Sequence, residues 1–169
     1  SELAGGAALP TRIETTGALT VDGLSSNRAD AGSESITGGG IGYGSIESTA
    51  DVDVRNSVRV GGNAALVSGT SIRITASSTP DVDADADGGS GSLVDISEAE
   101  STGTIDDQTT VKVDTGAALS AITTLTLEAK TNQSLDVMAE TDSGGAAAIP
   151  TSTATGDVTT SVLVDIGRA

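Results

Sequence analysis

The chain repeats itself every 53 residues, and this periodicity constrains the fold more than any single motif does. The triplets LTV, IRI and LTL lie at 19–21, 72–74 and 125–127, so that both intervals are 53 residues. Tandem copies of one unit are the sequence signature of repeat architectures, in which each unit packs against its neighbours. The sequence therefore predicts three stacked copies of one structural unit.

A second set of triplets sharpens the predicted boundaries. VRV, VKV and VLV end at residues 60, 113 and 164, with intervals of 53 and then 51 residues. We expect repeats over about 12–64, 65–117 and 118–169, with 1–11 as the tail of a preceding copy, and all of it as one repetitive domain. Neither end carries an atypical capping unit, which predicts either continuation of a longer array or head-to-tail association.

Apolar and acidic residues alternate within each copy. In the second copy Val82, Ala84 and Ala86 alternate with aspartates, and the matching positions of the other copies follow the same parity. A period of two residues is typical of a half-buried strand and not of a helix. The pattern predicts one long strand over 72–86, or two strands joined at a corner near Pro80.

The composition favours a regular stack over a single globular core. Phe, Trp, Cys and His are absent, Tyr43 is the only aromatic residue, and there are 22 glycines. Aromatic side chains dominate most compact cores, so a chain without them must bury many small side chains in layers. We expect an all-β fold, a β-solenoid like a parallel β-helix, with two or three coils per repeat; an antiparallel stack of long strands is the alternative.

The charge limits the possible partners. Eight basic and 24 acidic residues give a net charge of −16. Such a field repels phosphate backbones and anionic lipids, so nucleic acid is not an expected partner. No run approaches the roughly 18 apolar residues of a membrane span, so we expect no membrane insertion. The absence of cysteine excludes disulfides and cysteine-based metal sites.

Three aspartates, Asp83, Asp85 and Asp87, are the candidate metal ligands. With Gly88 they match the start of an EF-hand loop, but Val94 stands where the bidentate glutamate belongs. An acidic outer strand face is therefore the favoured interpretation, and calcium is the alternative. If equivalent carboxylates stacked about 4.8 Å apart, each contact would cost about 0.9 kcal/mol in bulk water. Such columns favour several coils per repeat or bound cations.

Catalytic chemistry has few candidate residues. Without His or Cys, acid/base catalysis would need carboxylate pairs such as Glu98/Glu100 or Asp106/Asp107. The equivalent positions in the first copy are not acidic pairs, and neighbouring acids are common in a chain this acidic. We expect no enzyme, no catalytic residue and no cofactor-binding residue.

Segments 78–101 and 109–119, with their Val/Thr/Ala/Asp strands and glycine turns, resemble the repeats of very large bacterial exoproteins. The resemblance is to filamentous-haemagglutinin and autotransporter passenger regions. It implies a secreted or cell-surface β-solenoid that acts as a stalk, filament or adhesin segment.

Together these observations predict a non-enzymatic structural protein of the bacterial cell exterior that assembles by strand stacking. Its expected partners are further copies or further repeats of the same chain, and possible surface glycans. An adhesin module that binds glycan or calcium is the alternative. A carbohydrate-active enzyme on a β-helix scaffold is a third possibility.

Overall fold

The computed structural model describes residues 2–3 and 11–167, and its regular structure is entirely β. The strands form three sheets in which each interior strand lies between its equivalents in the neighbouring repeats. The described residues include no helix that could cross a lipid bilayer. The strands are β1 (Glu2–Leu3), β2 (Thr11–Thr15), β3 (Leu19–Thr37), β4 (Ile41–Val60), β5 (Ala64–Ser68), β6 (Ser71–Ser90), β7 (Val94–Val113), β8 (Ala118–Ala121), β9 (Thr124–Thr131), β10 (Ser134–Ser143) and β11 (Ala147–Ile166).

The predicted stacking of the repeats is confirmed. Leu19 pairs with Ile72, and Ile72 pairs with Leu125, so the three residues lie in one column across the coils. Every pairing between the described strands is parallel, which makes the antiparallel alternative wrong. The fold is an all-β, solenoid-like stack of parallel strands built from 53-residue repeats.

Each repeat forms a single coil, so the expectation of two or three coils per repeat is wrong. The reason is the length of the strands: β4, β6 and β7 have 20 residues each, and one out-and-back pair uses most of a repeat. The expectation that the VLV triplet at 162–164 is equivalent to VKV at 111–113 is also wrong. Val164 pairs with Val111 and Ile166 with Val113, which keeps the offset at 53 residues.

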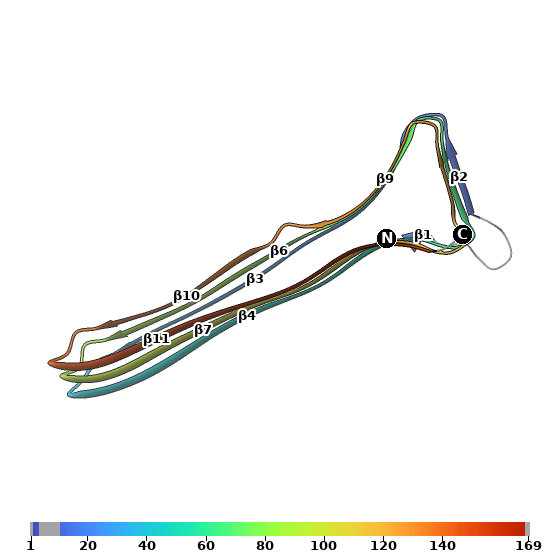
Figure 1. Cartoon of the computed structure of the whole chain (residues 1–169). Helices are drawn as coiled ribbons and strands as arrows, with labels where there is room; N and C mark the ends of the chain where they lie inside the picture. The colour runs from blue at the N-terminus through green and yellow to red at the C-terminus, as the bar shows by residue number, and fades with distance from the viewer. Residues whose placement is uncertain (1, 4–10, 168–169) are drawn as a thin grey trace.

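The coils have a flat, elongated outline (Figure 1). One long sheet contains β3, β6, β9 and β10, and the other contains β4, β7 and β11, with β1 at its edge. The two run side by side along a narrow arm and separate near the chain termini, where β2, β5 and β8 form the third side of a triangle (Figure 1). β1 lies beside the end of β4, where the tail of a preceding repeat was expected; residues 4–10 of that tail lie outside the described residues.

The long strands are less interrupted than the sequence indicated. β6 continues through Pro80, so that no corner forms there, and residues 41–60 form one unbroken strand. The long strands end at Thr37, Ser90 and Ser143 and resume four residues later, so short turns join them. Only the third copy breaks, between β9 and β10.

The core of the arm is one thin layer of small side chains. The central cluster contains Val52, Val82, Ala84 and Ile105, which the inward parity of the sequence correctly indicated. Gly103 lies on the inward side of β7, and a Cβ atom added there would lie 2.6 Å from Val137 Cγ2 and 2.7 Å from Leu135 Cδ1. The space beside Gly103 is therefore already filled by side chains of the opposite sheet, which would have to move to admit an added methyl group.

We predict that Gly103→Ala destabilises the protein by about 1–3 kcal/mol, because the added methyl group overpacks the core. Gly32→Ala is the matched control, since a Cβ at Gly32, an exposed residue of β3, meets nothing within 4 Å. Urea denaturation of both variants measures the difference. Equal stabilities would contradict the tight side-chain packing around Gly103.

Candidate functional site

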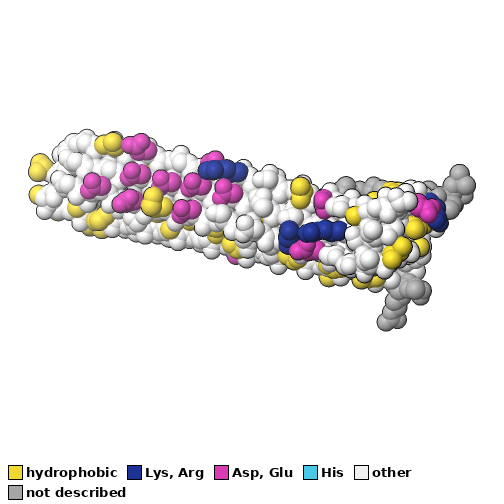
Figure 2. Space-filling model, turned by 90° about the horizontal axis from the view of Figure 1, so that it is seen from above, with side chains coloured by type: hydrophobic (Ala, Val, Ile, Leu, Met, Phe, Trp, Pro, Cys, Tyr) yellow, Lys and Arg dark blue, Asp and Glu magenta, His cyan; other side chains and the backbone are white. Residues whose placement is uncertain are grey.

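The candidate metal ligands lie on an acidic outer face. Asp83, Asp85 and Asp87 are at alternate positions of β6, opposite in parity to the buried Val82, Ala84 and Ala86. This confirms the strand interpretation, because residues 71–90 form no loop. Figure 2 shows acidic side chains gathered on this face, over the half of the molecule away from the termini.

Carboxylates of neighbouring coils stand in columns on this face. Asp30 and Asp136 flank Asp83, whereas Glu34 and Glu140 flank Asp87. With one coil per repeat, these groups lie on adjacent strands about 4.8 Å apart, so the columns form without the added spacing that several coils would give. The outer face therefore carries a like-charge repulsion that the fold does not avoid.

Arg28 offsets part of this repulsion, because it lies beside three of the carboxylates. Its guanidinium lies 2.6 Å from Asp30 Oδ1, 3.6 Å from Asp81 Oδ2 and 3.8 Å from Asp83 Oδ2. The hydrogen bond to Asp30 and the charges of these carboxylates raise the pKa of Arg28 above its ordinary value. All these side chains are well exposed, so the contribution of each ion pair to stability is small.

The geometry of the face differs from that of a compact metal site. Alternate residues of a strand are about 6.6 Å apart, and their side chains point in parallel and do not converge. Among the described residues, no group of three or more carboxylates is close enough to hold a metal ion. A shallow cleft of about 340 Å³ lies beside Asp85 and Asp87 and is also lined by Gly32, Ser33 and Glu34.

We predict that Asp87→Ser raises the melting temperature by about 2–5 °C at low salt, because it removes two like-charge contacts from one column. Asp114→Ser is the contrasting variant and should melt lower. Asp114 is 2.6 Å from Arg59, whose hydrogen bond lowers the pKa of this carboxyl group. Both shifts should shrink in high salt, as calorimetry would show.

The same measurement separates screening from calcium binding. We expect sodium and calcium chlorides to raise the melting temperature of the wild type equally at equal ionic strength. A larger rise with calcium that disappears in the Asp87→Ser variant would contradict a simple acidic face and indicate a bound cation.

Acidic and basic residues are strongly segregated along the length of the coils. We define the distal arm as residues 29–54, 82–107 and 135–160, which pair with one another in register. The distal arm contains seventeen of the 24 acidic residues and none of the eight basic ones, a net charge of −17. The rest of the chain contains seven acidic and eight basic residues, a net charge of +1.

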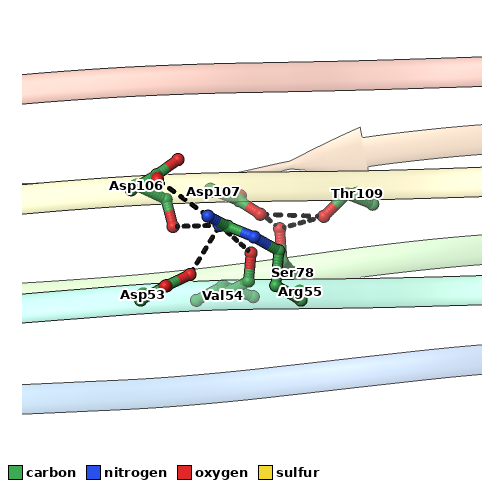
Figure 3. A network of polar contacts seen from close by, with 7 residues as sticks. All are labelled: Asp53, Val54, Arg55, Ser78, Asp106, Asp107 and Thr109. Atoms are coloured by element: carbon green, nitrogen blue, oxygen red, sulfur yellow. Dashed lines mark hydrogen bonds and ion pairs between the residues drawn. The ribbon is translucent and has the colours of Figure 1, made fainter.

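A buried polar layer lies at the base of the distal arm, between two apolar clusters of the core. Asp107 is fully buried, and it accepts hydrogen bonds from Ser78 at 2.5 Å and from Thr109 at 2.9 Å (Figure 3). Thr131 of the third coil donates a further hydrogen bond to Asp107. A buried carboxylate needs such partners, because its desolvation is otherwise costly.

Asn56 belongs to the same layer and connects the two long sheets. Its side-chain amide donates hydrogen bonds to the backbone oxygens of Gly23 at 3.1 Å and Ser77 at 2.8 Å. Both acceptors lie on the opposite sheet, on β3 and β6. The layer therefore fixes the position of one long sheet relative to the other by directional bonds, which aliphatic contacts cannot do.

Arg55 covers this layer on the outer side of β4. It lies 2.5 Å from Asp53 and 2.8 Å from Asp106 (Figure 3). The hydrogen bond to Asp106 raises the pKa of Arg55 above its ordinary value. Arg28 and Arg55 thus mark the boundary of the distal arm on its two faces.

The candidate carboxylate pair Asp106/Asp107 does not come together. Asp106 points outward to Arg55, whereas Asp107 points inward into the polar layer. Sequence reasoning missed this layer, although one signal was present: Asp107 occupies an inward position that holds Val54 in the first copy. Glu98 and Glu100 both face outward on β7, with Ser45 and Glu47 beside them.

We predict that Asp107→Ala destabilises the protein by about 2–4 kcal/mol, because it removes the acceptor to which the hydroxyl groups of Ser78 and Thr131 donate. Asp106→Ala removes the neighbouring exposed carboxylate and should cost less than about 1 kcal/mol. Chemical denaturation of the two variants gives both values. Equal losses would show that the buried polar layer has no special role.

Comparison of the chain with protein-family models, with curated proteins and with solved structures finds no significant match. The resemblance to bacterial exoprotein repeats therefore remains a prediction from the sequence.

Proposed function

We propose that this protein is a non-enzymatic structural segment of the bacterial cell exterior: an extended stalk, filament or adhesin segment that lengthens by strand stacking. The observation that carries the proposal is the constant 53-residue register between coils. A coil that pairs in this way with both neighbours is a template for the next coil, whether from the same chain or from another copy.

The outermost strands of the stack support this proposal. β3 ends one long sheet and β11 ends the other, and each pairs with a strand on one side only within the described residues. The third coil also exposes apolar side chains on β11: 43% of Val162 and 38% of Val164 are accessible. Exposed strand edges of this length are templates for pairing with another chain.

The charge on the two end coils should control this assembly. In a junction that continues the register, the third member of each column meets the first member of the same column in the next copy. β1 already pairs with β4 at Arg59 and Val60, so the new contacts would form along the rest of the strands, and there acid would meet acid in four columns. These four are Asp22 with Glu128, Asp30 with Asp136, Glu34 with Glu140, and Asp51 with Asp157. Salt should therefore promote assembly by screening these contacts.

We predict head-to-tail oligomers that grow with protein concentration and with salt, measured by sedimentation velocity and electron microscopy. Val164→Lys should prevent them, because it places a charge on the inward side of the end strand, next to the position of Val111. Leu163→Lys is the matched control and should still assemble, since its column partner Thr110 faces outward.

Monomers alone, at high protein concentration in both low and high salt, would contradict assembly from separate copies. They would favour the other form of the proposal, in which the coils continue within one longer chain. Circular dichroism of both lysine variants checks that the coils themselves remain folded.

One observation favours an adhesin module as the second candidate function. The outer face over 28–36, 81–89 and 134–142 contains nine acidic residues and one basic residue, Arg28. A face of this charge is suited to a cationic or calcium-bridged ligand. The sodium and calcium comparison described above tests the calcium form of this function.

A further inference from the structure

Six apolar side chains form a contiguous patch at the far end of the distal arm. They belong to two neighbouring columns of the sheet that contains β4, β7 and β11, on its outer face. We call them the apolar tip patch: Ile41, Val94 and Ala147 in one column, and Tyr43, Ile96 and Ile149 in the next.

The patch is open to solvent. The accessible fractions are 83% for Ile41, 67% for Tyr43 and 64% for Ile149. The strand alternation prevents these side chains from turning inward, because Gly42 and Asp95 occupy the buried positions between the columns. The only aromatic side chain of the protein therefore lies on its surface, among isoleucines.

An exposed apolar patch of this kind marks an interaction site more often than a solitary exposed leucine does. It is also repeated in every coil, so that the two columns run along the stacking direction. The size is modest, since standard interfaces use about 20–30 residues on each side. The patch is thus suited to a small contact surface, such as a peptide segment.

The charge around the patch selects the partner. Glu98 follows Ile96 on the same face of β7, and Glu47 and Glu100 form the next column. The whole distal arm has a net charge of −17 and no basic residue. Two such arms would repel each other, because both are strongly negative. An anionic lipid surface would be repelled in the same way.

We propose that the apolar tip patch is the docking site for a polypeptide whose apolar side chains are bordered by Lys or Arg. The apolar residues would cover the two columns, and the flanking cations would lie over Glu47, Glu98 and Glu100. Electrostatic attraction of such a partner accelerates binding, and apolar burial stabilises the complex. The proposal does not depend on the assembly described above.

Three synthetic peptides without aromatic residues test it. The first has two isoleucines flanked on both sides by pairs of lysines, the second has serines in place of the isoleucines, and the third has glutamates in place of the lysines. Tyr43 emission and the anisotropy of a label on the peptide report binding. We expect the first peptide to change Tyr43 emission and to bind about tenfold more tightly than the second. The third should not bind.

The variant Ile96→Ser/Ile149→Ser should weaken binding of the first peptide by about tenfold or more. The control is Leu24→Ser, which removes an apolar side chain that is 79% exposed but lies outside the distal arm and should leave the affinity unchanged. Circular dichroism confirms the fold of both variants.

Three results would overturn the proposal. The first is equal affinity of the isoleucine and serine peptides, which would leave only a nonspecific charge effect. The second is wild-type affinity in the double serine variant. The third is dimerisation of the wild type that the double variant abolishes in sedimentation experiments, because the occupant of the patch would then be a second copy of this chain.

Discussion

Parallel pairing of each residue with its own equivalent in the next repeat is the constraint on which the rest of the structure depends. Because the register is 53 residues throughout, equivalent side chains, many of them similar, lie about 4.8 Å apart in columns. Inside the coils this arrangement is favourable, since Ile, Val and Ala of one coil pack on those of the next. Outside, the same rule brings carboxylates together. The ordered core and the acidic faces therefore have one common cause.

The buried polar layer and the charge boundary occur at the same place in the coils. Asp107 and Asn56 lie inside, whereas Arg28 and Arg55 lie outside, where the distal arm begins. An apolar core built from small residues allows neighbouring sheets to slide, because many positions are interchangeable. Directional hydrogen bonds remove that freedom and specify one alignment of the two long sheets.

The features that could be predicted from the sequence are those that repeat. The intervals between LTV, IRI and LTL gave the stacking, and the alternation at 82–87 gave the inward and outward faces of β6. Features that belong to one copy were harder to predict. The hydroxyl partners of Asp107 come from three different strands, so no local pattern indicates them. The coil number was mispredicted because strands of 20 residues are unusually long.

The closeness of the two long sheets has a mechanical consequence. Each coil extends for a strand of 20 residues in one direction, but in the other direction a single layer of side chains separates its two long sheets. A stack of such coils has the cross-section of a ribbon and not of a rod. It would flex readily across its thin dimension and resist bending within the plane of its sheets, so its stiffness would depend on the direction of the applied force.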